Sequence, residues 1–267
     1  MVRRMSIKDY FGIGVDESKI SKMYFGVNGI ARKVKKIYEG DENGLAREIF
    51  SSGSPIGTLA VDSSVFMNVN GVRTEFLIVH QGIPSTSFYD ASCNGTWLLM
   101  KNIYTMKTAG SRDYSKSNPH KYLNGDFLAL FDDNVASVIK QVKIPYTVSD
   151  ATAKTTTVYS GANGLSTKIF LLSLAEVGYG PAEDRDGYKL SYNTNANYGK
   201  NVAYYNGVAE HWFVRTTSYA SSMYLRWIYS TSGGAGGGGS YYDQHGIRPA
   251  LILPSDTLVD TEFNVIA

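Results

Sequence analysis

Hydrophobic and polar residues alternate in two neighbouring segments near residue 70, with a turn signal between them. In the first segment Val65, Met67 and Val69 occupy every second position, and the second segment reads Glu-Phe-Leu-Ile-Val over 75–79. A period of two places alternate side chains on one face of a strand. Asn70-Gly71 lies between the segments and favours a tight turn, because both residue types tolerate positive φ. The pattern predicts a β-hairpin.

Four further segments, mostly apolar, have the length of short buried strands. They are 94–100, 169–172, His211–Arg215 and Gly246–Leu253. Short apolar runs bounded by turn residues are typical of strands with both faces covered. Because the last two segments bracket residues 216–245, we expect two core strands to hold that stretch at one edge or face of a small sheet.

Each of these last two segments contains an arginine, Arg215 or Arg248. The guanidinium group is planar and donates hydrogen bonds in a forked geometry. We expect both arginines to be structural and to bond backbone carbonyls or a buried carboxylate such as that of Glu176. Contact with a ligand is the alternative.

Helical spacing of apolar residues is confined to about 117–140. Asn118 can cap a first helix, Pro119 fits its first position, and Asn124-Gly125 is expected to end it. Asp132 or Asp133 can cap a second helix. Its buried face would carry the apolar residues at helical spacing: Val135, Val138, Ile139 and Val142.

Two later segments show neither the alternation of a strand nor the helical spacing of apolar residues. Residues 148–166 are rich in Thr, Ser, Ala and Gly, and residues 181–210 look irregular. Both are predicted to be surface loops. The acidic stretch Pro181–Gly187 is expected to be solvated, and a Ca²⁺ site built from its oxygen atoms is the alternative.

The first fifty residues contain a short repeat, because 26–33 recurs as 40–48 with an Asn-Gly pair in each copy. Asn-Gly predicts hairpin turns, so we expect two small β-hairpins. Such units bury little surface alone and are expected to pack on a partner or on their own copies. Accidental similarity within a flexible tail is the alternative. Residues 51–55 resemble a linker, which divides the chain into an attachment or oligomerisation segment, 1–50, and a main domain, 51–267.

Composition singles out residues 216–245 as a candidate binding surface, with five Tyr, six Ser, six Gly and only two charged residues. Tyrosine offers rigid amphipathic contact area, and Ser and Gly adapt around it. The residues expected to contact a ligand are Ser218, Tyr219, Tyr224, Arg226, Trp227, Tyr229, Tyr241, Tyr242 and Asp243. Core burial is the alternative for Trp227, because strand alternation would place Leu225 and Trp227 on the face opposite Arg226.

Charge and targeting signals limit the partners and the cellular location that we expect for the protein. The net charge is +2, so nucleic-acid binding is not expected. No apolar run approaches the roughly 18 residues of a membrane span, so membrane insertion is not expected either. The N-terminus lacks the apolar core of a signal peptide. The protein is therefore expected to be made in a cytosol and to leave by cell lysis, as virus particles do.

No motif favours catalysis, a metal or a cofactor. The single cysteine, Cys93, is expected to be a small buried residue, and His80 a satisfied core residue. A reactive Cys93–His80 pair is the alternative. Metal-ligand spacings are absent, and no motif indicates the paired carboxylates of a glycosidase. Residues 233–239 are expected to be a flexible loop tip, because the Gly-Lys-Ser/Thr ending of a phosphate-binding loop is missing.

Six separated motifs resemble a functionally uncharacterised domain that is common in gut-bacterial and phage proteins. They are Asn94–Leu99, Tyr122–Gly125, Lys140–Tyr146, Lys168–Glu176, His211–Arg215 and Gly246–Leu251. The resemblance covers about 55–260. It implies an α+β, C-type-lectin-like domain related to formylglycine-generating enzymes, with small twisted antiparallel sheets and two or more short helices. Those enzymes use two cysteines, so their activity is not expected here. Many relatives have Trp-Leu-Arg-Ser-Pro where this chain has Phe213–Thr217, so the loop after this strand is expected to differ in shape.

The N-terminal repeat resembles segments of phage tail and tail-fibre proteins. Together, the resemblances imply a non-catalytic receptor-binding protein at the tail tip of a phage or phage-tail-like particle. Its partners would be a bacterial cell-surface glycan or protein receptor and, through residues 1–50, other tail or baseplate proteins. A homotrimer is expected, since tail tips usually carry several copies. The alternatives are a structural tail or baseplate subunit whose Tyr-rich face binds a neighbouring protein, and a bacterial enzyme.

Overall fold

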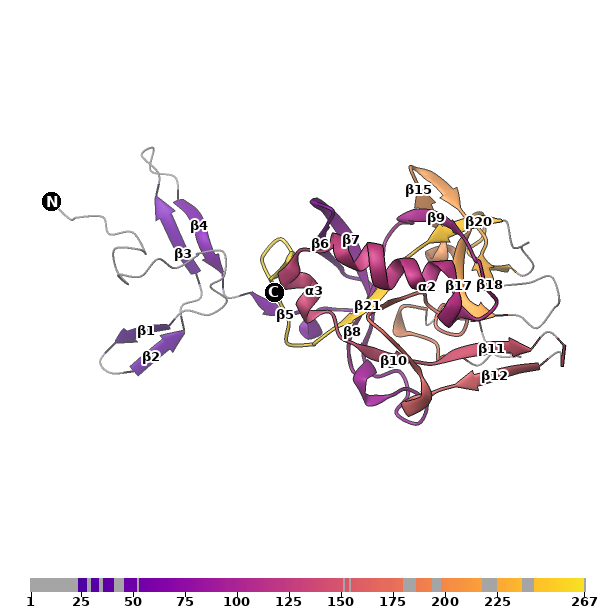
Figure 1. The fold of residues 1–267 in the computed structure, drawn as a ribbon. Helices are drawn as coiled ribbons and strands as arrows, with labels where there is room; N and C mark the ends of the chain where they lie inside the picture. Colours follow the sequence, from indigo (N-terminus) through magenta and orange to yellow (C-terminus); the bar gives the residue numbers. More distant parts are fainter. Residues whose placement is uncertain are drawn as a thin grey trace. The chain divides into compact units, whose positions relative to one another are not determined.

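The computed structural model describes four strands between residues 24 and 51, and then most of residues 53–266. Within the latter range it does not describe 151, 154, 180–185, 194–197, 218–224 and 237–242. The chain divides into two compact units, Met1–Gly53 and Ser54–Ala267, and Figure 1 shows the elements of both.

The described strands of the first unit pair as two antiparallel hairpins. They are β1 (Tyr24–Val27) with β2 (Ile30–Lys33), and β3 (Lys36–Gly40) with β4 (Ala46–Ser51). Val27 pairs with Ile30, which leaves two residues between the strands, the length that an Asn-Gly hairpin turn requires. The prediction of two hairpins is therefore confirmed.

The second unit contains a five-stranded antiparallel sheet in the order β14-β21-β8-β7-β6. Its strands are β6 (Ser64–Val69), β7 (Val72–Gly82), β8 (Gly95–Met100), β14 (Ile169–Phe170) and β21 (Ala250–Leu253). Asn70 and Gly71 have φ values of 53° and 72°, as the predicted tight turn requires. Every residue of β8 and β21 is buried, so these central strands have both faces covered.

A second five-stranded sheet has the order β19-β18-β17-β20-β9. Its strands are β9 (Thr105–Thr108), β17 (Trp212–Thr217), β18 (Leu225–Ile228), β19 (Ala235–Gly236) and β20 (Gln244–Ile247). β17 and β20 are parallel, and the other pairs are antiparallel. After β20 the chain passes through Arg248-Pro249 into β21, so the segment 246–253 links the two sheets. In Figure 1 this second sheet and the pair β5 and α3 lie toward opposite ends of the unit.

Smaller sheets complete the second unit. They are β10 (Val142–Ile144) with β13 (Leu165–Thr167), β11 (Tyr146–Asp150) with β12 (Thr155–Tyr159), β15 (Ala203–Tyr205) with β16 (Val208–Glu210), and β5 (Ser54–Pro55) with β22 (Leu258–Val259) and β23 (Val265–Ile266). The expectation that 148–166 and 181–210 consist of loops was therefore wrong for the strands β11, β12, β13, β15 and β16, whereas the described residues between 186 and 202 form no strand. β12 is mostly exposed and has no buried face, so it lacks the apolar alternation by which strands are recognised.

The first described helix, α2 (Asn118–Tyr122), begins as a capped helix but does not end where the sequence suggested. Ser117, rather than Asn118, is the N-cap, and its Oγ accepts a hydrogen bond from His120 N at 3.2 Å. The helical path continues through Asn124-Gly125 as a wider turn over Leu123–Phe127 and a short 3₁₀ turn over Leu128–Leu130. The predicted stop was therefore wrong.

The second helix, α3 (Asp133–Val138), starts after Asp132 as predicted, but the Asp132 side chain makes no capping hydrogen bond. Val135 within this helix and Ile139 at its end are buried, Val138 is partly buried, and Val142 belongs to β10. The unit is thus built mainly of small, largely antiparallel sheets with few short helices, consistent with an α+β or mainly β class. Among the described residues, no helix is long and apolar enough to cross a membrane.

Candidate recognition surface

β17 is buried along its whole length, and Arg215 fixes its position. The Arg215 guanidinium, which is fully buried, donates to the carbonyl oxygens of Pro145, Leu171 and Asp186 at 2.7–2.8 Å. It also forms a two-bond ion pair with Glu176, Nη1–Oε2 at 2.6 Å and Nη2–Oε1 at 2.5 Å. Burial by itself would lower the pKa of Arg215, but the Glu176 carboxylate outweighs it and raises this pKa. Arg215 is therefore structural, as expected from the sequence.

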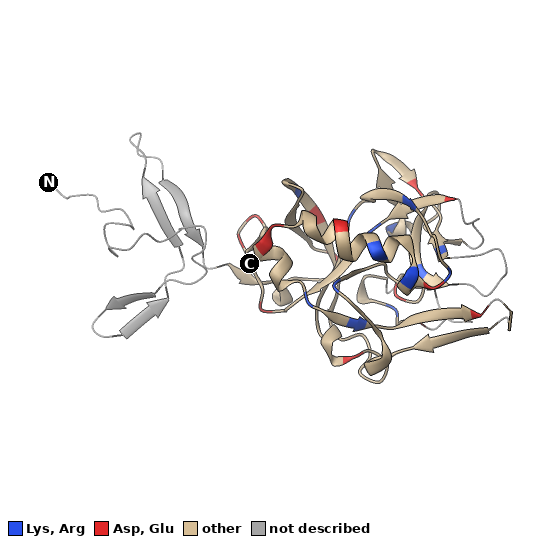
Figure 2. Cartoon of the chain, viewed as in Figure 1, with Lys and Arg blue, Asp and Glu red and all other residues tan. Residues whose placement is uncertain are grey.

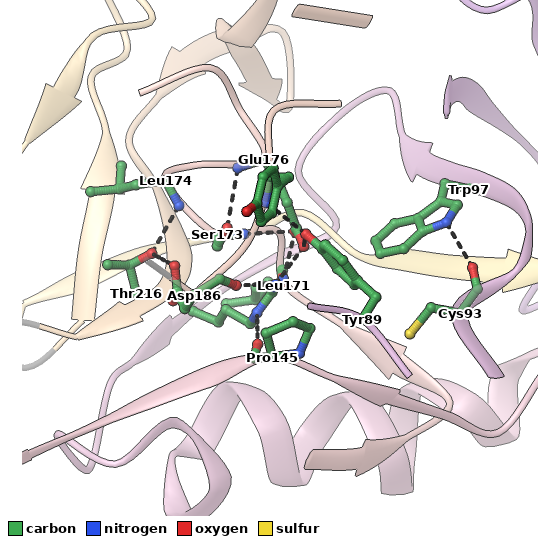
Figure 3. Close-up of polar contacts among 12 residues, drawn as sticks. Tyr89, Cys93, Trp97, Pro145, Leu171, Ser173, Leu174, Glu176, Asp186 and Thr216 are labelled. Atoms are coloured by element: carbon green, nitrogen blue, oxygen red, sulfur yellow. Dashed lines mark hydrogen bonds and ion pairs between the residues drawn. The ribbon is translucent and has the colours of Figure 1, made fainter. Parts of the chain in front are cut away.

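The Glu176 carboxylate, also fully buried, receives further donors (Figure 3). Its Oε1 accepts from Tyr89 Oη at 2.8 Å, and its Oε2 accepts from Ser173 N at 3.0 Å. Burial, and then the nearby Glu176 charge, raises the pKa of Tyr89 well above its usual value, so the phenol stays protonated and donates. Tyr89 Oη in turn accepts from Tyr188 N at 2.8 Å. Five segments distant in sequence therefore converge on one ion pair.

Asp186 and Thr216 extend this network toward the end of β17. Thr216 Oγ1 donates to Asp186 Oδ1 at 3.0 Å and accepts from Leu174 N at 2.8 Å. Asp186 and Thr216 are both fully buried. The expectation of a solvated acidic stretch at 181–187 is therefore wrong for Asp186, whereas 181–185 lie outside the described residues.

Arg248 holds in place the segment 246–253, which links the two five-stranded sheets. Its guanidinium is buried and donates from Nε to Met100 O at 2.9 Å and from Nη1 to Asn201 O at 3.4 Å. The guanidinium carbon lies 5.0 Å from the centre of the Trp212 ring. Burial lowers the pKa of Arg248 to about 10. This arginine also has the structural role expected, with carbonyls rather than a carboxylate as its acceptors.

A row of aromatic contacts, Trp227, His245, His211 and Tyr229, leads from the core to the surface. Trp227 is 7% exposed, and its ring centre lies 4.6 Å from that of His245. The His245 ring stacks on His211 at 5.7 Å, and His211 meets Tyr229 edge-on at 5.4 Å. Burial, and then the neighbouring His211, lowers the pKa of His245 to about 4, so this imidazole is neutral at pH 7. Tyr229 ends the row with 39% of its surface exposed.

The connection between β18 and β19 is a tight turn, Tyr229–Gly234. Gly233 N donates to Tyr229 O at 3.0 Å, and Tyr229 N donates to Gly234 O at 2.8 Å. Gly233 has a φ of +65°, and a Cβ there would lie 1.7 Å from Tyr198 O, so only glycine fits. The expectation of a flexible tip over 233–239 is therefore wrong for Gly233-Gly234, whereas 237–239 lie outside the described residues.

Two tyrosines that sequence reasoning missed hold this turn in place. Tyr179 Oη donates to Gly233 O at 2.8 Å. The ring of Tyr179 stacks on that of Tyr198, with centres 4.2 Å apart and planes 13° apart. Nothing in the sequence connects these positions to Gly233, because each comes from a segment without apolar periodicity.

The structure describes four of the nine predicted ligand-binding residues. Tyr229 and Asp243 are exposed, Arg226 is partly exposed, and Trp227 is buried, which is the alternative that strand alternation left open. Ser218, Tyr219, Tyr224, Tyr241 and Tyr242 lie outside the described residues.

The residues considered for catalysis occupy structural positions. Cys93 is buried, its Sγ donates to Lys143 O at 3.3 Å, and burial raises the pKa of its thiol to about 12. His80 Nδ1 bonds Ser191 Oγ at 2.8 Å. Within the part of the chain that the structure describes, no three His, Cys, Asp or Glu side chains form a metal-binding group. In Figure 2, Lys and Arg as well as Asp and Glu are distributed over the described elements of the second unit.

Comparison with known proteins identifies a family but no function. A family model described as a domain of unknown function, DUF6273, matches residues 94–255. Since the match covers more than half of the chain, the chain belongs to this family. No curated protein and no solved structure matches the chain.

Proposed function

We propose that this DUF6273 protein is a receptor-binding protein at the tail tip of a phage or phage-tail-like particle, and that it recognises the bacterial cell surface without catalysis. The observation that carries the proposal is the placement of the two strands at the ends of residues 216–245. This Tyr-, Ser- and Gly-rich segment leaves β17 and returns as β20, and these two strands are neighbours in one sheet. Both are tied to the core by buried arginines.

Rigid support of a polar, tyrosine-rich surface is the physical requirement of a recognition module. Binding loses affinity when side chains and loops must be ordered on contact. Here Arg215 and Glu176 fix β17, and the aromatic row fixes Tyr229, before any partner arrives. The same arrangement supports the proposal that the second unit is a C-type-lectin-like domain, in which a small sheet presents a long segment at one edge.

In this proposal the first unit, with its two hairpins, attaches the chain to other tail or baseplate proteins and assembles it as a homotrimer. Two hairpins expose much of their surface unless they pack on a partner. Their repeat resembles segments of phage tail proteins, which supports attachment to a particle.

The test is the binding of the fluorescently labelled full chain to a panel of bacterial strains. We expect saturable binding to a subset of strains and competition by unlabelled protein. If the chain binds no strain and instead captures only tail or baseplate proteins, the receptor-binding proposal is wrong and the chain is a structural subunit.

A further inference from the structure

Three tyrosines from three separate segments gather beside the turn Tyr229–Gly234. Tyr198 and Tyr229 are 37% and 39% exposed, and Tyr179 is partly exposed. The position that a Cβ of Gly234 would take lies 3.5 Å from Tyr179 Oη and 3.9 Å from Tyr229 Cδ2. Tyr179 and Tyr229 therefore both lie against Gly234, the first with its phenol hydroxyl and the second with a ring edge.

These three tyrosines are held in place before any ligand binds. The Tyr179–Tyr198 stack and the hydrogen bond from Tyr179 Oη to Gly233 O hold two of the rings, and His211 supports the third. Aromatic side chains held in this way bind with little further loss of conformational freedom. A ligand that docks on exposed but immobilised tyrosines therefore causes little loss of side-chain conformational entropy.

The described side chains around the tyrosines are rich in hydroxyl groups. Ser232 Oγ lies 3.0 Å from the Cβ position of Gly234. Lys200, in the same short turn as Tyr198, is paired with Asp62 at 2.5 Å and lies over the Tyr192 ring. Its charge is thus already matched. Among the described residues, a ligand here meets tyrosine rings, phenol hydroxyls and serine.

We propose that Tyr179, Tyr198 and Tyr229 form a subsite for one neutral sugar ring of a cell-surface glycan. A sugar ring offers an apolar C–H face that packs on an aromatic ring, and hydroxyl groups that bond to tyrosine and serine oxygens. This inference rests on the proposed function and names the chemical class of its receptor. It extends the surface beyond 216–245 to two residues, Tyr179 and Tyr198, that lie outside that segment.

The first test uses saturation-transfer NMR on the full chain with five separate sugars: glucose, galactose, mannose, rhamnose and N-acetylglucosamine. A single-ring subsite is expected to bind on the order of millimolar. We expect transfer to the C–H protons of at least one sugar, and affinity at least about fivefold lower in Tyr198→Ala. Tyr159→Ala, which removes a tyrosine of similar exposure (39%, against 37% for Tyr198) on β12, should bind as the unchanged protein does. Tyr198→Leu, which keeps an apolar side chain without a ring, replaces Tyr198→Ala if the latter unfolds. Absence of transfer to all five sugars, or equal affinity in the Tyr198 variant, overturns the proposal.

The second test separates the sugar subsite from the broader function. Periodate cleaves the vicinal diols of cell-surface sugars, and protease removes protein receptors. If the chain binds a strain, periodate treatment of the cells should abolish binding and protease should not. Binding that survives periodate but not protease overturns the sugar subsite and leaves the receptor-binding function intact. Sugar binding detected by NMR without binding to any strain would support the sugar subsite and contradict the receptor-binding function.

Discussion

Arg215 and Glu176 form a buried ion pair with two parallel hydrogen bonds, and both side chains are fully excluded from solvent. The pair joins β17 to the turn that follows β14, 39 residues apart in the chain. A buried ion pair is favourable only when its remaining donors and acceptors are satisfied. Here the carbonyls of Pro145, Leu171 and Asp186 complete the shell of the guanidinium. The strand that leads into residues 216–245 is therefore held by a polar network in the core.

Loss of the Glu176 charge should destabilise the fold strongly. Glu176→Gln keeps the shape of the side chain but deprives the buried Arg215 charge of the carboxylate that is hydrogen-bonded to it. We expect a loss of about 3–5 kcal/mol in the free energy of unfolding, measured by urea denaturation. Lys101→Met, which breaks the exposed pair with Glu75, should cost less than about 1 kcal/mol. Equal, small effects of both variants would contradict the assigned role.

Substitution of glycine by alanine should have opposite effects on stability at Gly236 and at Gly125. A Cβ on Gly236 would lie 2.1 Å from Trp227 Nε1, so Gly236→Ala should cost about 1–3 kcal/mol through overpacking. Gly125, within the helical turn Leu123–Phe127, has open space beside it. Gly125→Ala should raise stability by about 0.5–1 kcal/mol. Thermal unfolding of the two variants checks both signs, and a neutral Gly236→Ala would show that β19 does not cover the indole as described.

Removal of one hydroxyl should loosen the turn Tyr229–Gly234. Tyr179→Phe keeps the stack on Tyr198 but deletes the donor to Gly233 O. We expect a loss of about 0.5–1.5 kcal/mol and faster amide hydrogen exchange at Gly233. Tyr159→Phe on β12 should leave exchange at Gly233 unchanged. Exchange that is equally slow in both variants would show that the hydrogen bond does not restrain the turn.

His245 should make stability depend on pH in acid. Its pKa is lowered from 6.5 to about 4, so between these values the unfolded chain binds a proton that the folded chain does not. Stability should therefore fall as pH decreases from about 6.5 towards 4. His245→Gln removes this contribution, so its free energy of unfolding should depend less steeply on pH in that window than that of the unchanged protein. Parallel pH profiles for the two proteins would contradict the assignment.

The parts of the fold that the sequence predicted are those set by local signals. Asn70-Gly71 between alternating residues was enough to predict β6 and β7, and Asp132 to predict the start of α3. The hairpin of β15 and β16 carried an equally clear Asn206-Gly207 signal, with φ values of 49° and 81°, but its short strands expose too many residues to show alternation.

Contacts distant in the sequence account for what was missed. The helical path continues past Asn124 because the amide of the Asn124 side chain is hydrogen-bonded to another segment. Its Oδ1 accepts from Lys168 N at 3.0 Å, and its Nδ2 donates to Ile169 O at 2.8 Å. Asp186 is buried because Thr216 and Arg215 bond to it. For the site, composition pointed to 216–245 and so to Tyr229, but only the folded chain places Tyr179 and Tyr198 beside it.

The most direct test of the central claim is the effect of Tyr229→Ala on the binding of the labelled full chain to a strain that it recognises. Tyr229 ends the aromatic row on the surface, so its loss should weaken binding by about tenfold or more while the unfolding temperature stays nearly the same. Tyr159→Ala should bind as the unchanged protein does. Unchanged binding by Tyr229→Ala would contradict the claim that the tyrosines at this turn contact the receptor.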